Sequence, residues 1–154
     1  MTEADAFEVI LLAAGTGSRF GGDKLLAPYR DGVLLDAALA TALAAPVRSV
    51  IVVTGANGDR VADVVREHGL RSGQSARLQT VHAADHLEGM GASLRAGAAA
   101  LPTDTAGVFV ILGDMPRIPL VIFSDLKTAV LAGAPAAAAC FQGKRGHPPS
   151  SAGR

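Results

Sequence analysis

The stretch of sequence that decides the fold is Val9-Ile10-Leu11-Leu12-Ala13-Ala14-Gly15-Thr16-Gly17-Ser18-Arg19-Phe20-Gly21-Gly22-Asp23-Lys24. Its first part is a short apolar run with β-branched residues, which is typical of a buried strand. Its second part is a turn rich in glycine. Ligands of open α/β sheets bind at the carboxyl ends of the strands, and this turn follows such an end. The stretch therefore predicts a buried strand that leads into a binding loop.

Similar apolar runs recur along the chain, separated by segments with the period of an amphipathic helix. They predict strands at residues 8–13, 49–54, 77–82, 108–112 and 136–141. The intervening segments predict helices at residues 34–45, 59–68 and 90–101, a fourth helix from Pro119, and an exposed loop at residues 70–76. This alternation indicates an α/β protein, a Rossmann-like three-layer sandwich with a mostly parallel sheet.

Length and composition limit the classes of function. The 154 residues suit one domain, and 14 Lys plus Arg balance 14 Asp plus Glu. This balance gives no support for a nucleic-acid partner or a membrane-surface partner. The single cysteine, Cys140, and the acidic first residues favour a cytoplasmic protein, and the apolar runs are too short to cross a bilayer.

The glycine-rich turn has the chemistry of a phosphate site. Its glycines permit backbone amides to converge on phosphate oxygens, and Arg19 and Lys24 add two positive charges. A Walker A loop is excluded because no Gly-Lys-Ser/Thr is present, and the dinucleotide fingerprint is weakened because Phe20 stands where glycine or alanine is needed. The alternative is a turn that binds nothing, with solvated cations.

Three further segments follow predicted strands or open a predicted helix. Asp114, directly after the strand at 108–112, is a candidate Mg²⁺ ligand beside the phosphate site, although a lone Gly-Asp often only caps a turn. The glycines at residues 89–97 suit either a nucleotide pocket at a helix start or close packing of a helix on the sheet. Thr54-Gly55 fits a binding edge or a tight exit from a strand.

The first turn resembles the MobA-like NTP transferases, which include the molybdenum cofactor cytidylyltransferases and guanylyltransferases. The family pattern is matched by Leu12, Ala13, Ala14, Gly15, Arg19, Phe20, Gly21 and Lys24. The Gly-Asp-Met-Pro of residues 113–116 and the Gly-Met-x-x-Ser-Leu of residues 89–94 also match. Residues 83–86, Ala-Ala-Asp-His, depart from the Asn-Pro-x-Trp that is usual there. The resemblance implies the fold of the nucleotide-diphospho-sugar transferases, without its last elements.

The resemblance also implies roles for residues. Lys24, Arg19 and Asp114 would be catalytic, with Asp114 the ligand of Mg²⁺. The implied nucleotide-binding residues are Leu12, Ala13, Ala14, Gly15, Thr16, Gly17, Arg19, Lys24, Thr54, Gly55, Gly89 and Ser93. Arg145, Gly146 and His147 resemble a segment near the acceptor pocket.

The implied reaction is transfer of CMP from CTP to the phosphate of molybdopterin, with release of pyrophosphate. Ala14 and the segment at 89–97 look like the branch that uses cytidine. The implied partners are CTP, a pterin-type molybdenum cofactor as acceptor, and a molybdoenzyme that receives the product. Two alternatives stay open: a related transferase with another phosphate acceptor, such as a sugar phosphate, and an inactive nucleotide-binding or cofactor-delivery protein.

The resemblance covers residues 8–148. We therefore expect an incomplete MobA-like domain over residues 1–148. Residues 149–154 carry no hydrophobic period, and we expect them to form a tail without regular structure, outside the family pattern.

Overall fold

The computed structural model describes residues 6–14, 24–84, 88–115 and 118–134, and it gives the backbone alone for residues 136–141 and 144–152. The strands are β1 (Phe7–Ala13), β2 (Pro28–Tyr29), β3 (Gly32–Val33), β4 (Ser49–Thr54), β5 (Leu78–His82), β6 (Gly107–Leu112), β7 (Ala136–Phe141) and β8 (Lys144–Ala152). The helices are α1 (Leu34–Ala44), α2 (Gly58–Ser72), α3 (Met90–Ala99) and α4 (Leu120–Leu131), with short 3-10 turns at Lys24–Leu26 and Ser75–Arg77.

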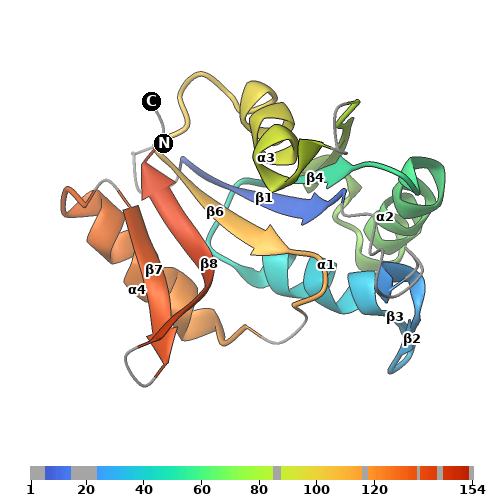
Figure 1. Cartoon of the computed structure of the whole chain (residues 1–154). Helices are drawn as coiled ribbons and strands as arrows, with labels where there is room; N and C mark the ends of the chain where they lie inside the picture. Colours follow the sequence, from blue (N-terminus) through green and yellow to red (C-terminus); the bar gives the residue numbers. More distant parts are fainter. Residues whose placement is uncertain are drawn as a thin grey trace.

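Six strands form the main sheet, in the order β5-β4-β1-β6-β8-β7 (Figure 1). The strands β5, β4, β1 and β6 are mutually parallel, so their carboxyl ends meet at one edge. β8 runs antiparallel to both β6 and β7. At the opposite edge Phe7 pairs with Gly107, and Gly107 pairs with Ala152. The predicted α/β class with a mostly parallel sheet is confirmed.

Helices cover both faces of this sheet. All seven residues of β1 are buried, which explains why a parallel central strand is almost continuously apolar. Alternate residues of the strands enter two different clusters. One cluster packs α1, α2 and α4 against the face that carries Phe7 and Phe109, and the other packs α3 against the face that carries Ile10 and Val53. The result is three layers, with β1 at the centre.

The second helix is longer than its sequence suggests. Gly69 was expected to end the helix and residues 70–76 to form a loop, and this expectation is wrong. α2 continues to Ser72 and ends at Gly73, whose φ of 70° is left-handed. Gly69 lies inside the helix. A β-carbon there would lie 2.8 Å from the Ser75 hydroxyl and 3.2 Å from Leu78, which explains why the residue is glycine. It serves close packing, and the glycine that terminates the helix comes four residues later.

The end of the chain also differs from expectation. The tail predicted to lack regular structure from residue 149 belongs, up to Ala152, to strand β8. Its backbone pairs with β7 and β6, with an irregularity in the β7 ladder between Ala138 and Cys140. Pairing of this kind uses backbone groups, so a strand with two prolines and no alternating apolar residues escapes a search for hydrophobic period.

Among the helices that the structure describes, none combines the length and the hydropathy needed to cross a membrane.

Candidate functional site

The site edge is the line of carboxyl ends of β4, β1 and β6. Leu12 and Ala13 end the central strand, Ala14 follows it, and all three residues are buried. Leu12 and Ala14 pack with Val53 and Ala83 in the cluster beneath α3. The Leu12 carbonyl accepts a hydrogen bond from the Gly113 amide at 3.0 Å. These three predicted residues therefore form the floor of the edge and hold the end of β1 against the end of β6.

The predicted phosphate loop itself lies outside the described residues. Gly15, Thr16, Gly17 and Arg19 fall within residues 15–23, so their predicted contacts with a triphosphate stay predictions.

The structure brings Lys24 and Asp114 together. The Lys24 ammonium lies 3.6 Å from a carboxylate oxygen of Asp114, and the two side chains are 43% and 41% exposed. Lys24 opens the 3-10 turn that follows the loop, and Asp114 follows β6. Opposite charges at this exposure contribute little to stability, so the pair remains available to a ligand.

Gly113 explains the approach of these two side chains. A β-carbon at Gly113 would lie 3.2 Å from both the Leu12 carbonyl oxygen and the Leu25 side chain. The Met115 amide donates to the Leu112 carbonyl at 3.1 Å, which closes a tight turn around Asp114. Because Leu25 neighbours Lys24, the packing of Leu25 on Gly113 sets Lys24 beside Asp114.

Asp114 fits a role as a shared metal ligand. Mg²⁺ is commonly bound by one or two carboxylates together with substrate phosphates and water. Among the described residues, no group of three or more His, Cys, Asp or Glu side chains could hold a metal ion alone. A cation at Asp114 can take further oxygens from a bound phosphate and from water.

The start of α3 carries the other predicted contacts. Gly89 caps the helix with a φ of 111°, a left-handed conformation that suits glycine, and no side chain caps the first amides. The Ser93 side chain is only 4% exposed, and its hydroxyl has no hydrogen bond to another described residue. Backbone amides at a helix start and a buried hydroxyl can form hydrogen bonds with a polar ligand.

The glycines at 89–97 differ in their surroundings, and the packing interpretation is confirmed for Gly97, whereas the nucleotide pocket stays a prediction. Gly97 faces the sheet, where a β-carbon would lie 2.8 Å from Ile10 Cγ2 and 3.0 Å from Val53 Cγ2. At Gly89, no atom of the described residues would lie within 4 Å of a β-carbon. The first therefore serves close packing of helix on sheet, and the second leaves room beside the helix start.

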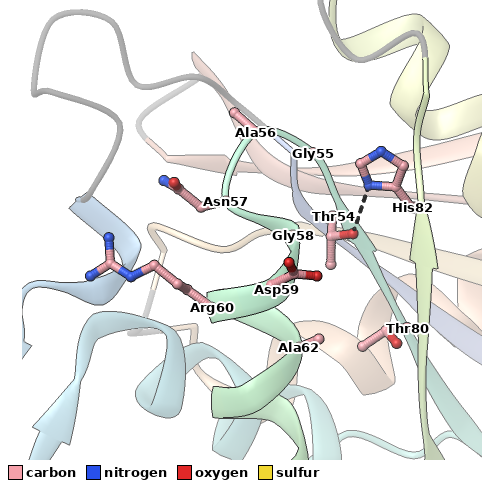
Figure 2. Close-up of a pocket in the computed structure, with 10 residues that line it drawn as sticks. All are labelled: Thr54, Gly55, Ala56, Asn57, Gly58, Asp59, Arg60, Ala62, Thr80 and His82. Atoms are coloured by element: carbon pink, nitrogen blue, oxygen red, sulfur yellow. Dashed lines mark hydrogen bonds between the residues drawn. The ribbon is translucent and has the colours of Figure 1, made fainter.

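Thr54 and Gly55 border a hollow of about 680 Å³ between β4, β5 and the first turn of α2 (Figure 2). The Thr54 hydroxyl donates to the Val81 carbonyl at 3.5 Å and lies 3.4 Å from Nδ1 of His82. The sequence assigned no role to His82. Only the register that sets Thr54 opposite His82 brings the two together, and no local pattern shows that register.

Arg145, Gly146 and His147 belong to the first half of β8. Because β8 runs antiparallel to β6, this half lies toward the carboxyl end of β6 and therefore toward Asp114. The backbone placement agrees with a site near an acceptor, and the side-chain contacts stay predictions.

A family model described as the MobA-like NTP transferase domain matches residues 9–154. The chain belongs to this family. Among relatives, it is 30% identical to the molybdenum cofactor cytidylyltransferase of Escherichia coli K12, over 79% of the chain and 58% of the relative. It is 36% identical to nicotine blue oxidoreductase of Paenarthrobacter nicotinovorans, over 71% of the chain and 50% of the relative. The chain therefore spans little more than half the length of these relatives.

Among solved structures of this transferase fold, one is Rv0371c of Mycobacterium tuberculosis H37Rv in complex with manganese. Its TM-score is 0.72 and its sequence is 25% identical, with 96% of this chain and 71% of that chain covered. The predicted family and its fold are thus confirmed. A related chain that holds a divalent cation also agrees with the chemistry of Asp114 described above.

Proposed function

We propose that this NTP transferase domain supports transfer of CMP from CTP to the phosphate of molybdopterin, with release of pyrophosphate. The observation that carries the proposal is the 3.6 Å approach of Lys24 to Asp114 at the edge that follows β1 and β6. A cation and a carboxylate side by side suit a triphosphate with its metal ion, since one binds phosphate oxygens and the other binds the metal.

The reaction needs alignment and charge stabilisation and no covalent nucleophile from the protein. An oxygen of the acceptor phosphate forms a bond to the α-phosphorus of CTP, and the bond from that phosphorus to the β-phosphate bridging oxygen breaks. The Lys24 ammonium stabilises negative charge on the α-phosphate as this group is transferred, and Arg19 binds β- and γ-phosphate oxygens. Asp114 would hold Mg²⁺, which would neutralise charge on the triphosphate. Arg145, Gly146 and His147 contact the acceptor.

The start of α3 can contact the base, and the preference for cytosine rests on Ala14 and on the resemblance of residues 89–97 to the branch that uses cytidine. The free amides beside Gly89 and the buried Ser93 hydroxyl supply donors to carbonyl-type acceptors of a base. Ala14, buried at the end of β1, occupies the position where the guanylyltransferase branch usually has glycine. The E. coli relative is a molybdenum cofactor cytidylyltransferase, which supports the same substrate.

The test measures pyrophosphate release with Mg²⁺, molybdopterin and either CTP or GTP. Lys24→Ala abolishes release with CTP and leaves the melting temperature unchanged. Lys127→Ala is the matched control, because Lys127 is a described lysine on α4 whose ammonium contacts Pro46 and the Phe7 ring. Unchanged turnover in Lys24→Ala would remove Lys24 from the reaction.

A second candidate is a transferase with another acceptor, or an inactive nucleotide-binding or cofactor-delivery protein. The alternative without nucleotidyl transfer is favoured by nicotine blue oxidoreductase, a relative of comparable identity that is an oxidoreductase. Calorimetry with CTP, GTP and ATP separates the readings. Binding of CTP without pyrophosphate release supports the second candidate, and absence of binding contradicts both.

A further inference from the structure

The outer edge of β5 is unlike the edges that natural sheets usually present. β5 is the first strand of the sheet order and pairs on one side with β4, and no strand within the described residues pairs with its other side. Its sequence is Leu-Gln-Thr-Val-His, without proline or formal charge at neutral histidine, and its register with β4 has no bulge. Charges, prolines and bulges are the usual protection of an edge strand.

The direction of the backbone groups of β5 follows from two hydrogen bonds. The Ala83 amide donates to the Thr54 carbonyl at 2.8 Å, and the Val81 carbonyl accepts from the Thr54 hydroxyl. Positions 81 and 83 therefore direct their backbone groups toward β4. Since successive residues of a strand direct these groups to opposite sides, Leu78, Thr80 and His82 direct theirs outward.

These outward positions are symmetric about Thr80. If a second β5 lies antiparallel against the first, Thr80 pairs with Thr80 of the partner subunit and Leu78 pairs with His82 of the partner subunit. The central Thr80 pair is a hydrogen-bonded pair, so it alone exchanges two backbone hydrogen bonds between the strands, and the flanking pairs continue the same register. Threonine opposite threonine is a favourable cross-strand pair, and no formal charge opposes a like charge when the histidines are neutral.

The helix above this edge is complementary to itself in the same arrangement. Asp59 and Ala62 line the hollow that also contains Thr80, so this side of α2 faces the β5 edge (Figure 2). Arg66 lies one turn beyond Ala62 on the same side of the helix and is 66% exposed in its pair with Asp63. A two-fold axis near Ala62 sets Asp59 of one copy opposite Arg66 of the partner subunit, and the small Ala62 permits close approach.

We propose that two copies of this chain pair through the outer edges of β5, so that one sheet continues across a two-fold axis with the two α2 helices side by side. The interface is isologous, because the same surface is used by both copies. β4 and β1 separate β5 from β6, so Lys24 and Asp114 remain outside the interface. The inference is independent of the substrate of the site.

The test is the molar mass in solution, measured by light scattering over a concentration series. The wild-type chain forms a dimer. Thr80→Pro removes one outward amide and no bond to β4, since proline is tolerated at an edge position of this kind. It raises the dimer dissociation constant at least about 100-fold, from two lost central hydrogen bonds. Thr80→Val is the matched control, which keeps the backbone amide and the dimer.

A second pair of variants does not depend on the folding of Thr80→Pro. Thr80→Lys and Thr80→Glu each oppose like charges across the axis and are monomeric at low salt, and their equimolar mixture is dimeric. A wild-type chain that is monomeric at its highest soluble concentration overturns the proposal. So does a dimer that persists in both Thr80→Lys and Thr80→Glu alone.

Discussion

The two edges of the parallel sheet are built differently. At the carboxyl edge Lys24 and Asp114 lie 3.6 Å apart and are both more than two-fifths exposed. At the amino edge the Glu8 carboxylate is 1% exposed and is fully bonded. It accepts from Arg48 Nε at 2.7 Å, from Arg48 Nη2 at 3.2 Å and from the Thr105 hydroxyl at 2.8 Å.

Hydrogen bonds at the amino edge connect the starts of all four parallel strands. Glu8 is in β1, Arg48 precedes β4 and Thr105 precedes β6. Arg77, directly before β5, donates to the carbonyls of Val47 at 2.8 Å and Arg48 at 3.3 Å. Charge-assisted hydrogen bonds thus fix the amino ends of the strands to one another. At the carboxyl ends, Lys24 and Asp114 are exposed and accessible to a ligand. The buried ion pair that stabilises the fold and the candidate binding groups therefore lie at opposite edges of the sheet.

The pKa values agree with this division. Hydrogen bonding to Glu8, and then to Asp104, raises the pKa of Arg48 above its ordinary value. The bond from Arg48 likewise lowers the pKa of Asp104. At the amino ends of the strands, the folded state therefore favours the charged form of Arg48 and of Asp104.

The largest expected effect comes from breaking the amino edge. Arg48→Met leaves the Glu8 carboxylate buried without its cation, which lowers the free energy of unfolding by about 3–5 kcal/mol. Urea unfolding measures it. The double variant Arg48→Met with Glu8→Gln is the control and recovers at least half of the loss, because the buried charge is gone. A loss below about 1 kcal/mol in the single variant would contradict the role of this edge.

Breaking the carboxyl edge has the opposite signature. Asp114→Asn lowers pyrophosphate release by about 100- to 1000-fold, the size expected for one charge-stabilising group. It changes the free energy of unfolding by less than about 0.5 kcal/mol, because the side chain is exposed. Asp31→Asn, at an exposed turn position, is the matched control for both assays. A large loss of stability in Asp114→Asn would contradict the division between edges.

A third variant tests the packing of α3 behind the site. Gly97→Ala forces a methyl group toward Ile10 and Val53 and lowers the free energy of unfolding by about 1–2 kcal/mol, overpacking outweighing the gain in helix propensity. Gly91→Ala is the control, since the nearest atom would be Arg95 Nη1 at 3.6 Å. It stabilises the protein. Equal effects of the two variants in thermal unfolding would exclude the packing explanation.

The smallest expected effect concerns the pH dependence of stability. Burial opposes the charged form of Asp36. Its pKa is nevertheless below the ordinary value, because the Val33 amide, His68 and Arg71 bond or face the carboxylate. A lowered folded pKa adds stability above the unfolded pKa of about 3.9, and this stability is lost as pH falls through the folded pKa.

Asp36→Asn therefore loses about 1 kcal/mol at pH 7, the usual worth of a cap, and less at pH 3. Urea unfolding at both pH values measures the difference. Asp125→Asn, on the exposed side of α4, is the control and shows no such change. A loss in Asp36→Asn that is the same at pH 7 and pH 3 would show that the charge is not responsible.

Burial explains which parts of the fold could be predicted from the sequence. The strands β4 and β6 were predicted within one residue, because a parallel strand covered on both faces has to be apolar. β8 was missed because its pairing depends on backbone groups alone. The end of α2 was predicted too early because a local rule assigns glycine to helix ends. At Gly69 the glycine is instead required by packing against Ser75 and Leu78.

The candidate site divides in the same way. Lys24 and Asp114 were both predicted, because parallel strands bring the residues that follow them to one edge. Glu8 with Arg48, and Thr54 with His82, were not predicted. Each of these contacts depends on which strands are neighbours and on their register. Strand order and register cannot be deduced from a single local segment.

The alignment of Phe7, Gly107 and Ala152 across β1, β6 and β8 has a practical consequence for handling the protein. The first described strand begins, and the last one ends, at the amino edge of the sheet. A tag or surface tether joined beyond either strand therefore departs from the edge opposite Lys24 and Asp114. Immobilisation through such a tether leaves the edge with Lys24 and Asp114 turned toward the solution, where a titrated nucleotide has direct access.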